Sequence, residues 1–197
     1  MKKDFLLEIG SENLPSGYIS QAIEQLRKGF EELFKANRID FESIKTFSTP
    51  LRLVVLARGV STKQSSTEEK VVGPPVKVGV DKNGNFTKAA IGFAKSQGVE
   101  VGSLKKIETE RGKYLAVIKK KKGRKTEVVL AESIPDVIAS VRFPKVMKWD
   151  GSGFRWPRPV RWVLAIFGSK VIKFRLGEID ADNKTCISIY RGIYKGV

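Results

Sequence analysis

The spacing of hydrophobic residues alternates along the chain between the two-residue period of strands and the three- to four-residue period of helices. Phe5, Leu7 and Ile9 alternate with their neighbours as far as Gly10, which predicts a first strand. Over residues 19–34, hydrophobic residues recur every three or four positions while charged residues take the opposite face. The sequence therefore predicts a strand followed by an amphipathic helix.

The rest of the chain contains further segments of both kinds. Short runs of β-branched or alternating apolar residues predict strands over residues 41–47, 51–60, 76–80, 104–109, 113–118, 160–167, 170–176 and 185–190. Two more helices are predicted over residues 87–97 and 126–141, and Pro135 kinks or restarts the second. Strands and helices in mixed order, with several strands joined by short turns, predict an α+β fold with mixed, largely antiparallel sheets and about three packed helices.

Local composition indicates the domain organisation. Residues 61–70 are almost wholly polar, which is typical of a surface loop, and a Gly-Pro-Pro sequence follows soon after. We therefore predict four parts, which are a strand-helix-strand part over residues 1–60, a loop or linker over 61–75, a second α+β part over 76–180, and a tail of unassigned fold over 181–197.

The charge balance points to a polyanionic partner. Lys and Arg number 37 against 21 Asp and Glu, so the net charge is +16, and nucleic acid is the first partner to consider. The alternative is a lysine-rich surface typical of a thermophile or an AT-rich genome. The single cysteine, Cys186, excludes an internal disulfide, and no apolar run approaches the roughly 20 residues of a membrane span. We therefore expect a cytoplasmic protein without membrane contact.

The sequence offers no self-sufficient catalytic or metal site. It contains no histidine, which excludes Ser-His-Asp and Cys-His nucleophiles and histidine metal ligands. It also lacks a glycine-rich phosphate-binding loop. Glu8 and Glu12 come closest to an acid-base pair, but a surface strand residue and a helix-entry acid explain them better. A hydrolase that uses these two carboxylates is the least favoured interpretation.

The stretch 142–162 contains all three tryptophans, six basic residues and one acid. Within it Arg155, Arg158 and Arg161 recur at every third residue, and two intervening prolines favour a polyproline II helix with three residues per turn. On such a helix the guanidiniums share one face about 9 Å apart, which suits a run of phosphates. The alternatives are that the aromatic residues fill a core and that the arginines are merely solvated.

A series of short motifs resembles the β subunit of bacterial heterotetrameric glycyl-tRNA synthetase. The motifs are LEIGSENLP at residues 7–15, TFSTPLRL at 46–53, GP at 73–74 with TKAAIGFA at 87–94, PKVMKW at 144–149, and FRWPRPVRW at 154–162. They resemble the EIGTEELP, FATPRRL, GP…TKAAxGFA, PKSMRW and FVRPVRW segments of that family. Each motif alone is weak, but their shared order and spacing from residue 3 to about 180 make the resemblance specific.

The chain also departs from the family pattern. Asn13 stands where the family favours Glu, and Leu51 stands where it favours Arg, which removes one cation. Residues 185–192 replace a histidine-containing RGHRF-like segment. The family subunit is several times longer and continues into helical HD-type and anticodon-binding domains, so the chain resembles an N-terminal fragment.

The resemblance implies a supporting role in a class II glycine–tRNA ligase. In that family the α subunit binds ATP, Mg and glycine, and the β subunit holds tRNA within an α2β2 heterotetramer. We therefore expect this chain to bind tRNA(Gly) and the α subunit, to bind no cofactor, and to be inactive alone. The candidate RNA-binding residues are Arg52, Lys145, Lys148, Arg155, Arg158 and Arg161. Docking of the same residues on the α subunit remains open, and the alternative function is a stand-alone basic RNA-binding module.

Overall fold

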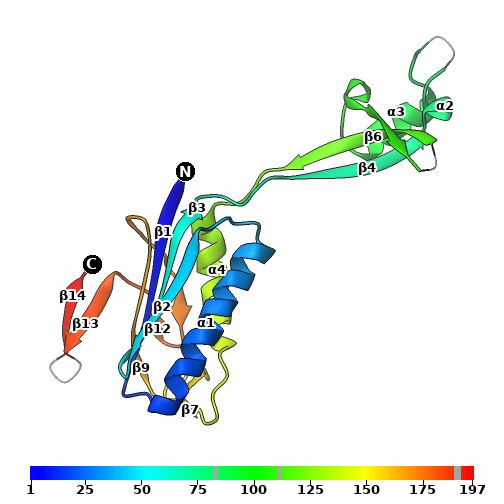
Figure 1. The fold of residues 1–197 in the computed structure, drawn as a ribbon. Helices are drawn as coiled ribbons and strands as arrows, with labels where there is room; N and C mark the ends of the chain where they lie inside the picture. The colour runs from blue at the N-terminus through cyan, green and yellow to red at the C-terminus, as the bar shows by residue number, and fades with distance from the viewer. Residues whose placement is uncertain (82–83, 111, 189–191) are drawn as a thin grey trace. The chain divides into compact units, whose positions relative to one another are not determined.

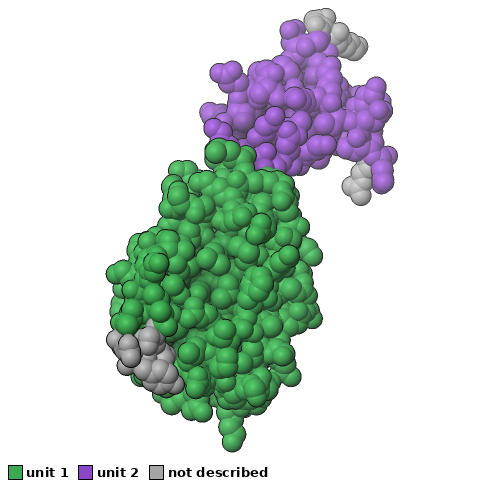
Figure 2. Space-filling view, turned by 60° about the vertical axis from the view of Figure 1, so that its left-hand side comes forward, with its two compact units in different colours: residues 1–65, 124–197 green, residues 66–123 purple. Residues whose placement is uncertain are grey.

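Tertiary contacts divide the chain into two compact units. The computed structural model describes residues 1–81, 84–110, 112–188 and 192–197. Unit 1 consists of Met1–Ser65 and Arg124–Val197, and unit 2 consists of Ser66–Gly123 (Figure 2). Unit 2 is therefore an insertion in the sequence of unit 1.

Unit 1 is built on a five-stranded antiparallel sheet. Its strands in spatial order are β10 (Lys170–Val171), β9 (Val160–Phe167), β1 (Lys2–Ser11), β3 (Arg52–Ser61) and β2 (Ser43–Thr49). Because β1 lies between β3 and β9, a strand from the second half of the chain completes a sheet that the first half begins. The sheet of unit 1 thus contains strands from the predicted parts 1–60 and 76–180.

Two helices cover one face of this sheet, namely α1 (Ser16–Ala36) and α4 (Thr126–Ala139) (Figure 1). Phe5, Leu7 and Ile9 point into the core beneath them and are at most 1% exposed. These residues are the alternating positions of the sequence, so the predicted first strand and the amphipathic helix are confirmed. The last predicted helix is also confirmed, and it continues through Pro135.

The opposite face of the sheet carries a hairpin of β13 (Lys184–Ser188) and β14 (Ile193–Gly196) (Figure 1). Residues 189–190 of the predicted strand 185–190 lie outside the described part of the chain. The remaining short strands of unit 1 are β7 (Met147–Lys148), β8 (Arg155–Trp156), β11 (Arg175–Leu176) and β12 (Ile179–Asp180).

The prediction of one strand over residues 170–176 is wrong. Within this segment only β10 pairs with β9, because the backbone of Asp182 already bonds that edge of β9, accepting from Ala165 N at 3.1 Å and donating to Val163 O at 2.9 Å. The chain therefore turns away after β10, and β11 pairs with β12 instead.

Unit 2 is a small α+β unit with a sheet of order β4-β6-β5. Its elements are β4 (Thr67–Pro75), α2 (Val76–Gly79), α3 (Lys88–Ser96), the 3-10 helix η1 (Val101–Ser103), β5 (Lys105–Thr109) and β6 (Gly112–Lys121). Leu115 and Val117 of β6 pack with Ala90 and Ala94 of α3. The predicted helix 87–97 and the predicted hairpin of 104–109 with 113–118 are therefore confirmed.

Two predictions within unit 2 are wrong. The polar residues after Ser66 form β4 rather than a loop, because Glu68 and Glu69 form ion pairs with Lys120 and Lys121 across the ladder. The segment 76–80, rich in valine, forms the helical turn α2 instead of a strand. Within the described residues, no helix is both long and apolar enough to cross a membrane.

A first prediction concerns Gly10 of β1, which lies opposite Trp162. A Cβ atom at Gly10 would lie 2.0 Å from the Trp162 ring. We expect Gly10→Ala to lower the free energy of unfolding by about 1 to 3 kcal/mol, because the indole must leave its position. Urea unfolding measures this change. Gly17→Ala is the matched control, since nothing lies within 4 Å of that Cβ position, and equal losses in both variants would refute the packing argument.

Candidate nucleic-acid interface

The strongest candidate for an anion-binding surface is the basic hairpin, defined here as residues 145–158. Within it β7 and β8 pair so that Lys148 lies directly opposite Arg155. Like charges at directly opposed positions repel each other unless an anion lies between them. Both side chains are exposed, and neither takes part in an ion pair among the described residues. Lys145 and Arg158 are also exposed and add two cations to the same segment.

The turn of the basic hairpin is held by hydrogen bonds to Asp150. Its carboxylate accepts from the Ser152 hydroxyl at 2.6 Å, from Ser152 N at 3.0 Å and from Glu178 N at 3.1 Å. The Glu178 carboxylate in turn accepts from Gly151 N at 3.1 Å. The Ser152 hydrogen bond and the backbone donors keep the pKa of Asp150 below its ordinary value. The turn is therefore fixed without drawing on any of the four cations.

Aromatic residues support the hairpin from beneath. Trp156 is 1% exposed, contacts Phe143 edge-on at 4.8 Å between ring centroids, and stacks with Phe154 at 5.9 Å. The predicted burial of the aromatic residues thus holds for Trp156. Because side chains alternate along a strand, burying Trp156 turns Arg155 outward.

Two apolar side chains also lie on the hairpin surface. Val146 is 42% exposed and Met147 is 43% exposed. Exposed apolar groups beside cations are typical of protein interfaces as well as of RNA-binding surfaces. The hairpin therefore has the chemistry of both candidate partners.

The three arginines spaced at every third residue do not form one polyproline II helix. Arg155 belongs to β8, Arg158 lies in a bend, and Arg161 belongs to β9 in a different sheet. Sheet pairing at both ends of the segment overrides the bias of its prolines. Arg161 also forms an ion pair with Glu12, so its charge is already partly neutralised.

Arg52 lies in a buried polar cluster on the hairpin-covered face of the sheet, which we call the Glu8 cluster. Glu8 is 8% exposed, so its prediction as a surface strand residue is wrong. Its carboxylate accepts from Arg52 Nη1 at 3.3 Å, from Trp162 Nε1 at 2.5 Å and from the Thr185 hydroxyl at 2.5 Å. Arg52 also donates to the Cys186 carbonyl at 2.8 Å and lies over the Trp162 ring at 5.5 Å.

The Glu8 cluster accounts for two of the candidate groups. Arg52 has its guanidinium occupied by protein acceptors, so it does not contribute to the basic hairpin. Glu8 and Glu12 are each bound by an arginine, and they do not face each other across a reaction site. Among the described residues, no group of three or more His, Cys, Asp or Glu could hold a metal ion.

Sequence analysis missed the Glu8 cluster because its members are far apart in the chain. One signal in the sequence could have shown the orientation of Glu8. Glu8 lies between Leu7 and Ile9, which face the core, so its side chain points to the other face of the sheet, away from the helices. Only the register of β1 with β3 and β9 shows that Arg52 and Trp162 share that face.

Comparison with known proteins gives a consistent match. The family model described as glycyl-tRNA synthetase beta subunit matches residues 5–191. Proteins named glycine–tRNA ligase beta subunit from Oleidesulfovibrio alaskensis, Persephonella marina and Halalkalibacterium halodurans are 41%, 40% and 42% identical over 92%, 93% and 93% of this chain. In each case the match covers 26% of the relative, so the chain spans about a quarter of the length of the curated relatives it matches.

A second prediction tests the Glu8 cluster. We expect Arg52→Ala to lower the free energy of unfolding by about 2 to 4 kcal/mol, because the Glu8 carboxylate stays mostly buried without its cation. Urea unfolding followed by tryptophan fluorescence measures the change. Arg58→Ala is the control, since Arg58 lies on the same strand, is exposed and has no ion pair within the described ranges. A loss below about 0.5 kcal/mol for Arg52→Ala, the usual effect of a surface substitution, would contradict the assignment.

Proposed function

Because the chain belongs to the glycyl-tRNA synthetase beta subunit family, we propose that it supplies an RNA-binding and subunit-assembly region to a glycine–tRNA ligase. The ligand of the basic hairpin is the phosphate backbone of tRNA(Gly), bound in the cytoplasm. The region carries no reacting group itself and supports the ATP-dependent attachment of glycine by a partner alpha subunit. This partner is inferred from the name of the relatives, and the expected assembly is an α2β2 heterotetramer.

One observation carries the RNA-binding part of this proposal, namely the direct opposition of Lys148 and Arg155 on β7 and β8. Strands that fold by themselves avoid like charges at facing positions, because the repulsion is uncompensated. A phosphodiester oxygen between the two cations removes the repulsion, and the guanidinium of Arg155 can bond it bidentately. The turn held by Asp150 keeps both strands in place before the ligand arrives.

The division of labour between subunits is what the family resemblance implies, and the pairing of two carboxylates agrees with it. Glu8 and Glu12 have arginine partners, and a carboxylate engaged in this way is poorly suited to accept a proton from a substrate. As the family resemblance implies, ATP, Mg and glycine belong to the alpha subunit in this proposal. The chain contributes affinity and orientation of the RNA.

Docking on the alpha subunit is a second candidate role for the basic hairpin. The exposed Val146 and Met147 favour it, because apolar groups gain little from phosphate contact. The facing cations Lys148 and Arg155 favour RNA binding instead. A stand-alone RNA-binding module would share the RNA contacts but would not copurify with a coexpressed alpha subunit.

A third prediction distinguishes RNA binding from docking on the alpha subunit by removing the charges of Lys148 and Arg155. We expect the double variant Lys148→Gln, Arg155→Gln to bind tRNA(Gly) more weakly and to reduce the slope of log affinity against log salt by about one unit, since the two cations share one phosphate and each phosphate contact contributes about 0.9. Filter binding across a salt series measures both quantities.

The matched control is Lys173→Gln, Arg175→Gln, which removes the same charge from two exposed cations that are already in ion pairs with Asp182 and Asp180. We expect the control variant to have nearly the same salt slope as wild type. Equal slopes in wild type and in the Lys148 and Arg155 variant would refute RNA contact by the hairpin. Loss of alpha-subunit binding with unchanged RNA affinity would assign the hairpin to docking.

A fourth prediction tests whether the hairpin is preorganised. Asp150→Ala raises the net charge by one and removes three hydrogen bonds from the turn. We expect weaker tRNA binding despite the added positive charge, because the strands lose their fixed geometry. Stronger binding in the same filter assay would show that charge alone controls affinity.

A further inference from the structure

One face of the sheet in unit 2 is left open by its helices. Leu115 and Val117 of β6 point toward α3 and form the core of the unit. Because side chains alternate along a strand, Tyr114 and Ile118 of the same strand lie on the other face. Val72 of β4 shares that face, since it pairs with Ala116, and it is 51% exposed.

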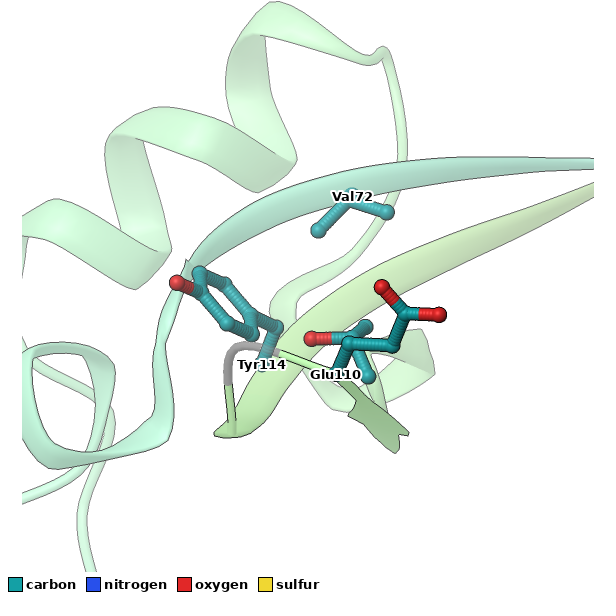
Figure 3. A pocket seen from close by; sticks show the side chains of 4 residues that line it. Val72, Glu110 and Tyr114 are labelled. Atoms are coloured by element: carbon teal, nitrogen blue, oxygen red, sulfur yellow. The ribbon is translucent and has the colours of Figure 1, made fainter.

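A pocket of about 400 Å³ lies at this open face. It is lined by Val72, Thr109, Glu110 and Tyr114, which come from β4, β5, the turn after β5, and β6 (Figure 3). The Thr109 hydroxyl is used internally, because it donates to the Gly112 carbonyl at 2.9 Å. The pocket thus offers an aromatic ring, an apolar side chain and a carboxylate.

The carboxylate of Glu110 is unusual for its surroundings. Residues 66–123 contain thirteen Lys and Arg and six Asp and Glu, which is a net charge of +7. Glu68 and Glu69 are paired with lysines of β6. Glu110 is exposed and has no ion pair among the described residues. A carboxylate that has no ion pair among the described residues, beside an aromatic ring in a cationic unit, suits a planar ligand that has hydrogen-bond donors and belongs to a polyanion.

Two lysines flank the pocket on the same face. Lys70 of β4 pairs with Ile118, and Lys105 of β5 pairs with Ala116. Directly paired residues project to the same side of a sheet, so these cations lie on either side of β6 on the face that carries Tyr114. Both are exposed and have no ion pair within the described ranges. They are placed to bind phosphates on both sides of a ligand in the pocket.

We propose that this pocket binds an unpaired guanine of RNA. The inference rests on the proposed function for the class of ligand, but it uses a different unit and different residues. Unpaired bases are recognised by stacking on aromatic side chains and by hydrogen bonds to their Watson-Crick edges. Tyr114 provides the ring, and Val72 provides an apolar contact for a base that enters the pocket.

The choice of guanine follows from the donors that face a carboxylate. Guanine presents N1–H and N2–H side by side, so the two oxygens of Glu110 accept both. Adenine and cytosine each place an acceptor beside their amino group, and uracil places two carbonyls beside its single N–H. Each of these acceptors repels a carboxylate oxygen. Glu110 therefore selects guanine, while Lys70 and Lys105 add affinity that is independent of sequence.

The test uses the full chain and four fluorescein-labelled RNA pentamers, in which G, A, C or U is flanked by two uridines on each side. Fluorescence anisotropy at low salt measures affinity. We expect the G pentamer to bind about tenfold more tightly than the others, as a bidentate pair discriminates. Glu110→Gln should abolish this preference, because its amide NH2 faces a guanine donor. Tyr114→Ala should weaken the G pentamer about five- to a hundredfold, the usual effect of losing a stacking ring.

Two control variants keep the test specific. Glu108→Gln removes the same charge from the opposite face of the sheet, since Glu108 pairs with Lys113 rather than with a residue of the open face, and we expect it to retain the preference. Tyr114→Phe keeps the ring and should bind like wild type. Circular dichroism confirms that each variant is folded.

Equal binding of the four pentamers by wild type, or a G preference that survives Glu110→Gln, would overturn the inference. Failure of the proposed function is distinguishable, because it appears as an unchanged tRNA salt slope after substitution of Lys148 and Arg155 in unit 1. If wild type prefers the G pentamer while the Lys148 and Arg155 variant keeps the tRNA salt slope, the guanine pocket is supported and RNA contact by the basic hairpin is refuted.

Discussion

The burial of Glu8 in the middle of β1 is the constraint on which unit 1 depends. A carboxylate that is 8% exposed is costly to desolvate unless cationic and polar donors surround it. The donors come from β3, β9 and β13, through Arg52, Trp162 and Thr185. A single charge thus ties together segments separated by as many as 177 positions. It also explains why Gly10 has no side chain, since Trp162 occupies that space to reach Glu8.

Buried aromatic residues also bear on where the cations of the stretch 142–162 lie. Trp162 bonds Glu8 on the hairpin-covered face of the sheet. The register of β9 shifts between Trp162 and Val160, and Arg161 at this shift is exposed and meets Glu12. Earlier in the segment, burial of Trp156 turns Arg155 outward against Lys148. In the stretch 142–162, Trp156 and Trp162 are buried while Lys148, Arg155 and Arg161 are exposed. The interpretation of the aromatic residues as core is therefore confirmed for these two tryptophans, and the interpretation of the cations as a binding surface stays a proposal.

The sequence predicted the elements with strong periodicity and missed those that depend on partners far along the chain. The strand that contains Phe5, Leu7 and Ile9 could be predicted, because the alternation of these residues alone identifies the face that packs in the core. By contrast, β4 begins with polar residues that become a strand only through cross-strand pairing of Glu68 and Glu69. The ion pair of Glu8 with Arg52 also could not be predicted from the sequence, because a one-residue change in the register of β1 with β3 would place the two side chains on opposite faces. The candidate cations could be found from composition, but only the structure shows which of them have no ion pair among the described residues.

We propose that the basic hairpin contacts tRNA, whereas the Glu8 cluster stabilises the fold of unit 1. Hydrogen-deuterium exchange of the chain, with and without tRNA(Gly), tests it most directly. We expect slower exchange over residues 145–158 in the presence of tRNA, and unchanged exchange around Glu8 and Arg52, whose amides already lie in the sheet. Protection around Glu8 and Arg52 with no change over residues 145–158 would contradict it.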